Sequence, residues 1–220
     1  MRIGLFGGTF NPIHFGHIHV SREIKETFPL DQIIMIPAAI PPHKKQRGIA
    51  EARDRLMMTQ IAVAHLEGYL VSDIEIMRSG PSYTIDTIAY FKTTLPAEAE
   101  PFLILGMDAF LEIDTWMAYT ELFDNLPLIV MSRPGTEHIG EPELTAYIQL
   151  HISEKYRFDN NRNGFRHPTK QAIHLADVAP YDISSTNVRE TIRKRASLKD
   201  MVPEQVEQYI RSKGLYGYVI

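Results

Sequence analysis

The densest group of chemically active residues lies near the N-terminus, where two histidines follow a pair of glycines. The segment reads Gly7-Gly8-Thr9-Phe10-Asn11-Pro12-Ile13-His14-Phe15-Gly16-His17. Glycines let the backbone approach a ligand closely, and residues three apart on a helix share one face. An apolar strand, a glycine turn, a helix start and two imidazoles in this order indicate a site for nucleotide phosphates.

The histidines have plainer explanations as well. A histidine pair at this spacing can cap or pack a helix, although the preceding Gly-Gly-Thr and Pro12 favour the phosphate site. A metal pair would need a third ligand nearby, and no His-Glu-x-x-His helix is present. His19 follows His17 by two residues and would point nearly the opposite way. We therefore exclude His19 and predict no metal site.

A second group lies in the last fifth of the chain and reads Ile183-Ser184-Ser185-Thr186-Asn187-Val188-Arg189. Ser185 is a natural N-cap, and the turn after it contains no Asp or Glu, which a helix dipole would favour. Arg189 follows one turn into the helix. A helix start with hydroxyls and a guanidinium suits an incoming polyphosphate. The alternative is an ordinary serine-capped surface helix, and Asp182 weakens the phosphate interpretation slightly.

Three further groups follow predicted strands or loops. The run Pro42-His43-Lys44 comes after an apolar strand, so Lys44 would reach a phosphate, although charge runs are usually solvated loops. The segment Gly80–Thr87 enters a capped helix whose N–H groups would bind a small carboxylate. After Gly106, Asp108 would accept hydrogen bonds from ribose hydroxyls. Trp116 would either stack on a flat ring or pack in the core.

Short apolar runs alternate with helical patterns along the chain. We predict strands at 3–6, 33–36, 70–76, 102–105, 128–131 and 173–178, and helices at 15–27, 51–66, 83–94 and, with a break, 107–125. This alternation predicts an α/β fold with a doubly wound, mostly parallel sheet that resembles the Rossmann arrangement. Ligands on such sheets bind at the carboxyl ends of the strands, at a topological switch point.

The remaining segments extend this single domain, which we expect to span residues 1–220. The stretch 134–171 is predicted to be an insertion with a short helix near 143–152 and a mobile loop after it, because 156–168 holds three asparagines, three arginines and little apolar periodicity. Residues 183–220 are predicted to form a small helical part, with helices at 185–196 and 203–213. Pro203 suits a first turn, and Gly214 suits a C-terminal cap.

The composition excludes several classes of protein for this chain. The 220 residues are 44% hydrophobic, carry a formal net charge of −4 and include no cysteine. Disulfides and thiolate metal sites are therefore excluded, and a general nucleic-acid binder would usually be basic. Neither a signal peptide nor a membrane span is visible, so we expect a cytoplasmic protein that contacts no membrane. A homo-oligomer is compatible with the sequence.

Together these motifs resemble the nucleotidyltransferase superfamily with the His-x-Gly-His signature and, more narrowly, the bacterial nicotinate-nucleotide adenylyltransferases. The resemblance covers most of the chain. The His-x-Gly-His element indicates only the superfamily, whereas Ser82-Tyr83-Thr84-Ile85-Asp86-Thr87 and Pro42-His43-Lys44 narrow it. Further matches are Gly106-Met107-Asp108, Ser132-Arg133-Pro134-Gly135, the segment from Ile183 to Arg189 and the ending Gly214-Leu215-Tyr216.

The resemblance implies that the protein joins ATP to nicotinate mononucleotide with Mg²⁺, which is bound mainly through the ATP phosphates. The residues with an implied catalytic role are His14, His17 and Arg189. ATP would be bound by Gly7, Gly8, Thr9, Phe10, Lys44, Gly106, Asp108, Ile183, Ser184 and Ser185. Nicotinate mononucleotide would be bound by Ser82, Tyr83, Thr84, Trp116 and Arg133.

Two departures from the family pattern and three rival functions remain. Asn11 replaces a common Asp, and we expect it to bond the backbone of the turn as an Asp would. The stretch 134–171 looks longer than usual. The rivals are an adenylyltransferase for nicotinamide mononucleotide or phosphopantetheine, and a nucleotide-sensing module without turnover. RNA binding through 151–170 is weaker, since five Lys and Arg against two Asp and Glu give this stretch only +3.

Overall fold

The computed structural model describes residues 1–40, 48–78, 80–132 and 139–218. The first half contains β1 (Arg2–Gly8), α1 (Phe15–Thr27), β2 (Gln32–Pro37), α2 (Ala52–Val63), β3 (Tyr69–Val71), α3 (Ile74–Met77), α4 (Thr84–Thr94) and β4 (Glu100–Gly106). The second half contains α5 (Met107–Phe110), η1 (Ile113–Thr115), α6 (Tyr119–Asn125), β5 (Leu128–Ser132), α7 (Glu141–His151), β6 (Arg157–Asp159), η2 (Asn160–Arg162), β7 (Gly164–Arg166), β8 (Ile173–Asp177), α8 (Ser185–Arg193), α9 (Glu204–Ser212) and η3 (Leu215–Gly217).

The described strands form one sheet in the order β3-β2-β1-β4-β5-β8-β7-β6. All pairings from β3 to β8 are parallel, and β7 and β6 add an antiparallel edge. The chain builds outward from β1 through β2 to β3, then returns to the other side of β1 to add β4. The sheet is therefore doubly wound as predicted, and the switch point lies between β1 and β4.

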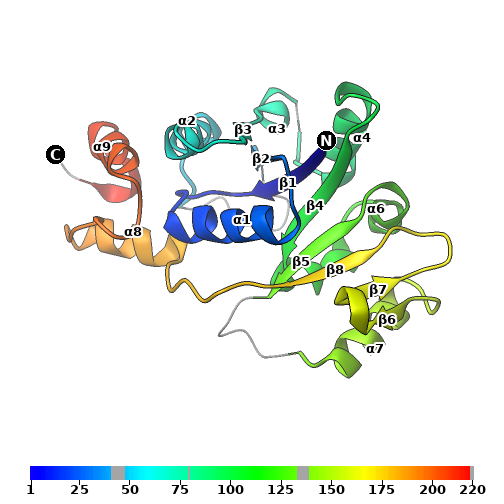
Figure 1. Cartoon of the computed structure of the whole chain (residues 1–220). Coiled ribbons are helices and arrows are strands. Elements are labelled where there is room, and N and C mark those ends of the chain that lie inside the picture. The colour runs from blue at the N-terminus through cyan, green and yellow to red at the C-terminus, as the bar shows by residue number, and fades with distance from the viewer. Residues whose placement is uncertain (41–47, 79, 133–138, 219–220) are drawn as a thin grey trace.

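Alternating side chains on the strands build one apolar layer on each face of the sheet. In β1, Phe6 faces the layer that contains Ile24 of α1, while Leu5 faces the layer that contains Ile88 of α4. Figure 1 shows α1 lying along the sheet while α4 and α6 occupy its other side. Both faces are therefore covered, which parallel strands require.

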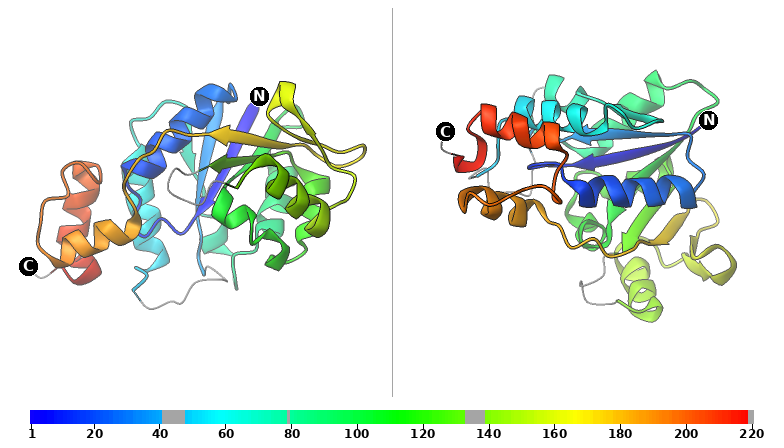
Figure 2. Two further views of the ribbon diagram at one scale, coloured as in Figure 1. Left: turned by 90° about the horizontal axis from the view of Figure 1, so that it is seen from below. Right: turned by 60° about the vertical axis from the view of Figure 1, so that its left-hand side comes forward.

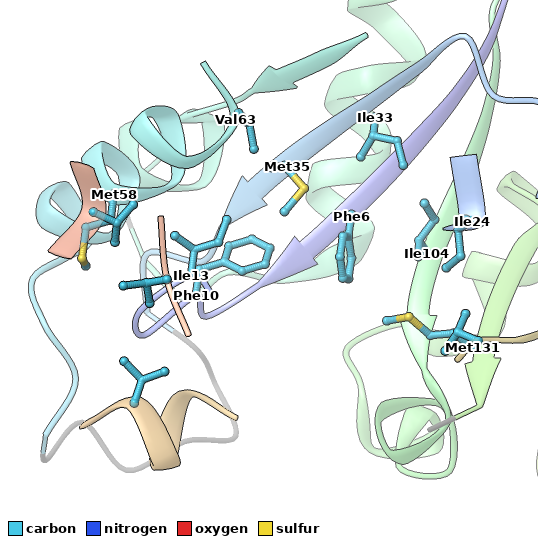
Figure 3. Packing of buried hydrophobic residues seen from close by; sticks show 14 of the residues in the cluster. Phe6, Phe10, Ile13, Ile24, Ile33, Met35, Met58, Val63, Ile104 and Met131 are labelled. Atoms are coloured by element: carbon cyan, nitrogen blue, oxygen red, sulfur yellow. The ribbon is translucent and has the colours of Figure 1, made fainter. Parts of the chain in front are cut away.

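The C-terminal helices lie together at the end of the molecule toward which β1 points (Figures 1 and 2). Their apolar stripes, represented by Val188 in α8 and Val206 in α9, are fully buried. They belong to the same cluster as Phe10, Ile13 and Met58 (Figure 3). This packing places the start of α8 beside the end of β1.

Three expectations about local structure are wrong. Of the predicted strand 70–76, only residues 70 and 71 are extended, as part of β3, and Ile74–Met77 is helical. The predicted loop after α7 contains β6, η2 and β7, because β6 pairs with β7 and β7 also pairs with β8. The cap of α8 is Ser184, which accepts a hydrogen bond from the Asn187 N–H at 3.1 Å.

Two expectations about the C-terminal helices are confirmed. The first turn of α8 contains no acidic residue. Gly214 follows α9 with a left-handed backbone (φ 60°), as a C-terminal glycine requires. Within the described ranges, no helix has both the length and the apolar character needed to cross a bilayer.

Candidate active site

A cavity of about 800 Å³ opens at the carboxyl ends of β1 and β4, a volume typical of small-molecule sites. It contains all the predicted site residues that the structure describes. The predicted site residues that line this cavity are Gly7, Gly8, Thr9, Phe10, His14, His17, Ser82, Tyr83, Thr84, Gly106, Asp108, Trp116, Ile183, Ser184, Ser185 and Arg189. The other two predicted residues, Lys44 and Arg133, lie outside the described residues.

Gly7 and Gly8 are the last residues of β1, and the turn that follows them, here called the glycine turn, is shaped by the ring of Phe10. A Cβ on Gly8 would lie 2.8 Å from this ring, so a side chain there would displace it. Phe10 itself has a left-handed backbone (φ 45°), which costs energy for a residue with a bulky side chain. Its ring is buried and packs edge-on against Phe6 and against His17. The core therefore holds the turn and one imidazole together.

The two imidazoles lie directly against each other. Their ring centroids are 3.8 Å apart, and the rings are tilted by 34°. His14 is the N-cap residue of α1 rather than part of the helix, but it still shares the face of His17. A Cβ on Gly16 would lie 3.0 Å from the His14 ring and 3.1 Å from the carbonyl oxygen of Ile183. Glycine at this position therefore lets the C-terminal segment approach the histidines.

The start of α8 is bonded to the N-terminal turn through side chains. Ser185 Oγ donates to the carbonyl oxygen of Pro12 at 3.0 Å. Arg189 Nη1 donates to the carbonyl oxygen of Asn11 at 2.8 Å, and Nη2 donates to Thr186 Oγ1 at 3.1 Å. The predicted hydroxyl and guanidinium groups thus face the cavity together with the imidazoles.

The opposite wall of the cavity consists of the start of α4 and the segment after β4. Tyr83 precedes the helix and Thr84 begins it. The N–H of Tyr83 donates to the carbonyl oxygen of Pro81 at 3.1 Å, whereas the N–H groups of Thr84 and Ile85 come before the first bonds of the helix. Trp116 is half-buried and lines the cavity, so it is not an ordinary core residue. Asp108 is exposed in the first turn of α5, which starts directly after β4.

The sequence interpretation missed two buried charged residues beside the cavity. Glu75 of α3 lines it, and Arg55 of α2 lies behind the glycine turn; they are 8% and 1% exposed. Burial raises the pKa of the Glu75 carboxyl, and hydrogen bonds from Thr87 and Ser82 oppose this rise. Arg55 precedes the apolar Met58 by three residues in the predicted helix 51–66. This spacing places both on the same, inner face of the helix, so the sequence did contain a signal that Arg55 is buried.

Asn11, one of the two departures, bonds outside the turn. Its Nδ2 donates to the carbonyl oxygen of Gly48 at 3.1 Å, and its Oδ1 accepts from the N–H of Ala50 at 3.0 Å. We expected Asn11 to bond the backbone of the turn itself. An amide can donate and accept at once, which this bridging position uses.

No cluster of three or more His, Asp or Glu residues that could hold a metal ion occurs in the part of the chain that the structure describes. The groups that converge on the phosphate side are imidazoles, hydroxyls and a guanidinium. Mg²⁺ prefers carboxylate, phosphate and water oxygens. The protein groups on this side are therefore suited to anions rather than to a magnesium cage.

Comparisons with known proteins agree with this geometry. The cytidylyltransferase-like family matches residues 5–191. A protein from Desulfatibacillum aliphaticivorans, named a probable nicotinate-nucleotide adenylyltransferase, is 40% identical over 219 residues, covering 98% of this chain and 100% of the relative. One of the same name from Geobacter sulfurreducens is 36% identical over 218 residues, 99% of each chain.

A solved structure shares the fold over nearly the whole chain. The nicotinic acid mononucleotide adenylyltransferase of Plasmodium falciparum, complexed with NaAD, has a TM-score of 0.74 at 20% identity and covers 99% of this chain and 98% of its own. The relatives also match along their full length. The chain therefore belongs to the cytidylyltransferase-like family and, within it, to the bacterial nicotinate-nucleotide adenylyltransferases.

Proposed function

We propose that the protein transfers the adenylyl group of ATP to nicotinate mononucleotide, forming nicotinate adenine dinucleotide and pyrophosphate for NAD biosynthesis. The observation that carries this proposal is the convergence of His14, His17 and Arg189 on one cavity. These groups donate hydrogen bonds to anions, and they stand opposite a helix start and a tryptophan suited to a flat, acidic ring.

The reaction requires positioning more than proton transfer. A phosphate oxygen of the mononucleotide attacks the α-phosphorus of ATP, and the bond from that phosphorus to the bridging oxygen of the β-phosphate breaks. The attacking phosphate is already ionised near neutral pH, so no strong base is needed. The obstacle is to bring two anions together and to stabilise the charge that develops on the α- and β-phosphates.

The imidazoles and the guanidinium meet this requirement as preorganised donors. His17 donates to the α-phosphate, and His14 contacts the departing phosphates. Arg189 and the helix start at Ser185 hold pyrophosphate as it leaves. Because these groups are fixed by packing and by bonds to the N-terminal turn, little reorganisation is needed during the reaction.

The remaining predicted ATP residues surround the nucleoside and the phosphates. Gly7 and Gly8 at the end of β1, with Thr9 and Phe10 after them, let the backbone approach a ligand, and Gly106 allows the same at the end of β4. Asp108 accepts hydrogen bonds from ribose hydroxyls. Ile183 contributes a backbone carbonyl near His14. Lys44 and Arg133 keep their predicted roles toward phosphate and mononucleotide as proposals.

The acceptor pocket distinguishes an acid from an amide. N–H groups near Tyr83 and Thr84 donate to the nicotinate carboxylate, whereas a carboxamide brings donors of its own. Ser82 supports this helix start, and Trp116 stacks on the pyridine ring. Mg²⁺ bound to the ATP phosphates would neutralise part of their charge; the described residues near the phosphates are hydrogen-bond donors rather than magnesium ligands.

An acceptor screen tests the proposal. The protein is incubated with ATP, Mg²⁺ and each of nicotinate mononucleotide, nicotinamide mononucleotide and phosphopantetheine, and pyrophosphate is measured. We expect a clear preference for nicotinate mononucleotide. Equal use of the amide would refute the pocket assignment, and ATP binding without pyrophosphate from any acceptor would favour a sensing module. A cytoplasmic location and any homo-oligomer stay predictions.

A further inference from the structure

The buried guanidinium of Arg55 joins three segments that surround the cavity. Its Nη1 donates to the carbonyl oxygen of Thr9 at 2.8 Å, its Nη2 to that of Ala39 at 2.9 Å and its Nε to that of Ala50 at 2.9 Å. Each of these bonds to backbone is charge-assisted, which offsets part of the cost of burying the cation. Arg55 therefore ties the glycine turn to the segment after β2.

The buried carboxyl of Glu75 organises the opposite side of the cavity in the same way. It accepts a hydrogen bond from Thr87 Oγ1 at 2.7 Å, and the Ser82 hydroxyl also favours the ionised carboxylate by lowering its pKa. Ser82 precedes α4 and Thr87 lies in its first turns, so Glu75 supports the start of this helix. Glu75 thus supports the segment to which the acceptor pocket was assigned.

The two groups meet at Ala39. The N–H of Ala39 donates to Ser82 Oγ at 2.9 Å, and its carbonyl oxygen accepts from Arg55. The backbone N–H of Ser82 also donates to the carbonyl oxygen of Ile40 at 3.1 Å. Hydrogen bonds therefore run from Thr9, on the ATP side, through Arg55 and Ala39 to Ser82, and Glu75 connects Ser82 electrostatically with Thr87 on the acceptor side.

We propose that Arg55 and Glu75 are positioning residues that set the distance between the ATP phosphates and the acceptor phosphate through Ala39 and Ser82. This inference rests on the proposed function, since it assigns the two walls to two substrates. Neither side chain takes part in bond making. Their effect is on alignment, and a displacement of about 1 Å in such a site can cost about 10² in rate.

The test uses Arg55→Lys and Glu75→Gln. In Arg55→Lys, a compact ammonium replaces the guanidinium fork and cannot reach the three carbonyls at once. In Glu75→Gln, the side-chain oxygen can still accept from one hydroxyl, but the NH₂ group is a donor and cannot accept from a second one. We expect kcat to fall at least about 10-fold in each. The Kd of ATP alone and of nicotinate mononucleotide alone should change less than about threefold, because each wall remains intact.

Two controls separate positioning from general destabilisation. Arg53→Lys alters an exposed residue of α2, two positions before Arg55. Asp73→Asn alters the exposed residue that precedes α3, the helix of Glu75. Both variants should retain wild-type kcat. Thr87→Val should lower kcat, and Thr87→Ser, which keeps the hydroxyl, should restore it. If Arg55→Lys fails to fold, the Glu75 and Thr87 variants decide.

The double variant Arg55→Lys/Glu75→Gln completes the test. If the two residues act through one chain of bonds, its kcat should be no lower than that of the worse single variant. Losses that multiply, or folded single variants with a reduced unfolding midpoint but wild-type kcat, would overturn the proposal. If the wild type prefers another acceptor, the same comparison with that acceptor tests the network while the proposed function itself fails.

Discussion

The Nη1 atom of Arg189 lies 2.8 Å from the carbonyl oxygen of Asn11, although 178 positions separate the two residues in the chain. This bond brings a helix from the C-terminal part to the turn that precedes His14. The guanidinium and the imidazoles therefore face one cavity, and each can be tested by substitution with a matched neighbour as a control.

His17→Ala should reduce turnover by about 10² to 10³, because one preorganised donor to the reacting phosphate is lost. The measurement is pyrophosphate release at saturating ATP and nicotinate mononucleotide, with circular dichroism as a check on folding. His19→Ala is the control, since His19 is exposed and stacks on Tyr181. Near-normal turnover of a folded His17→Ala variant would remove His17 from the catalytic site.

Arg189→Met should reduce kcat by roughly 10² and weaken product inhibition by pyrophosphate, because the cation that retains the leaving group is gone. Steady-state kinetics with added pyrophosphate measure both effects. Arg193→Met, at the exposed last turn of the same helix, should leave them unchanged. Pyrophosphate inhibition as strong as in the wild type would contradict the role of Arg189.

Trp116→Ala should weaken binding of nicotinate mononucleotide by about 10-fold and binding of ATP much less, since only the pyridine ring loses a stacking partner. Isothermal titration with each nucleotide alone gives both constants. Trp116→Phe, which keeps an aromatic face, should retain most of the affinity. A larger loss for ATP than for the mononucleotide would exclude Trp116 from the ring site.

The free energy of unfolding should fall as the pH is lowered from about 6.5 to 4, because His174 takes up a proton more readily in the unfolded chain than in the folded one. Burial, followed by the charges of Arg166, Arg2 and Arg162, lowers the pKa of His174 to about 4. The unfolded chain binds a proton near pH 6.5, so the neutral ring contributes its full stability above that pH and loses it on acidification through this window. Denaturant unfolding at pH 7 and pH 4.5 measures the change.

The matched variant is His174→Gln, which does not titrate in this range. Its free energy of unfolding should fall less between the two pH values than that of the wild type, by about 1 to 2 kcal/mol after allowance for partial exposure. Equal losses in both proteins would show that His174 does not titrate differently on folding. Activity near pH 7 should be the same in both.

Local signals in the sequence were sufficient for much of the fold and the phosphate side of the site. The apolar run of β1, the two glycines and the histidine spacing are short-range patterns, and each depends on neighbours within one turn or strand. The first turn of α8 without acids is a signal of the same kind. Sixteen predicted residues consequently line one cavity.

The hairpin of β6 and β7 was missed because its strands gain their apolar contacts from elsewhere. Phe165 is buried by pairing opposite Ile173 of β8, and the segment alone shows little periodicity. Its turn did carry a local signal. Asp159 accepts from the N–H of Asn161, and Asn163 adopts a left-handed backbone, both habits of Asx residues in turns.

The sequence by itself determined which groups carry chemistry. The imidazoles lie within one short motif, and the hydroxyls and the guanidinium lie within another, so their spacing can be seen without the fold. Only the tertiary structure decided that Arg55 reaches the start of α4 through Ala39, that Glu75 meets Thr87, and that Asn11 meets Arg189. The physical reason is that a buried charge must find its partners wherever packing supplies them. The partners of the two arginines are mostly backbone carbonyls, which every residue has and which no sequence pattern marks.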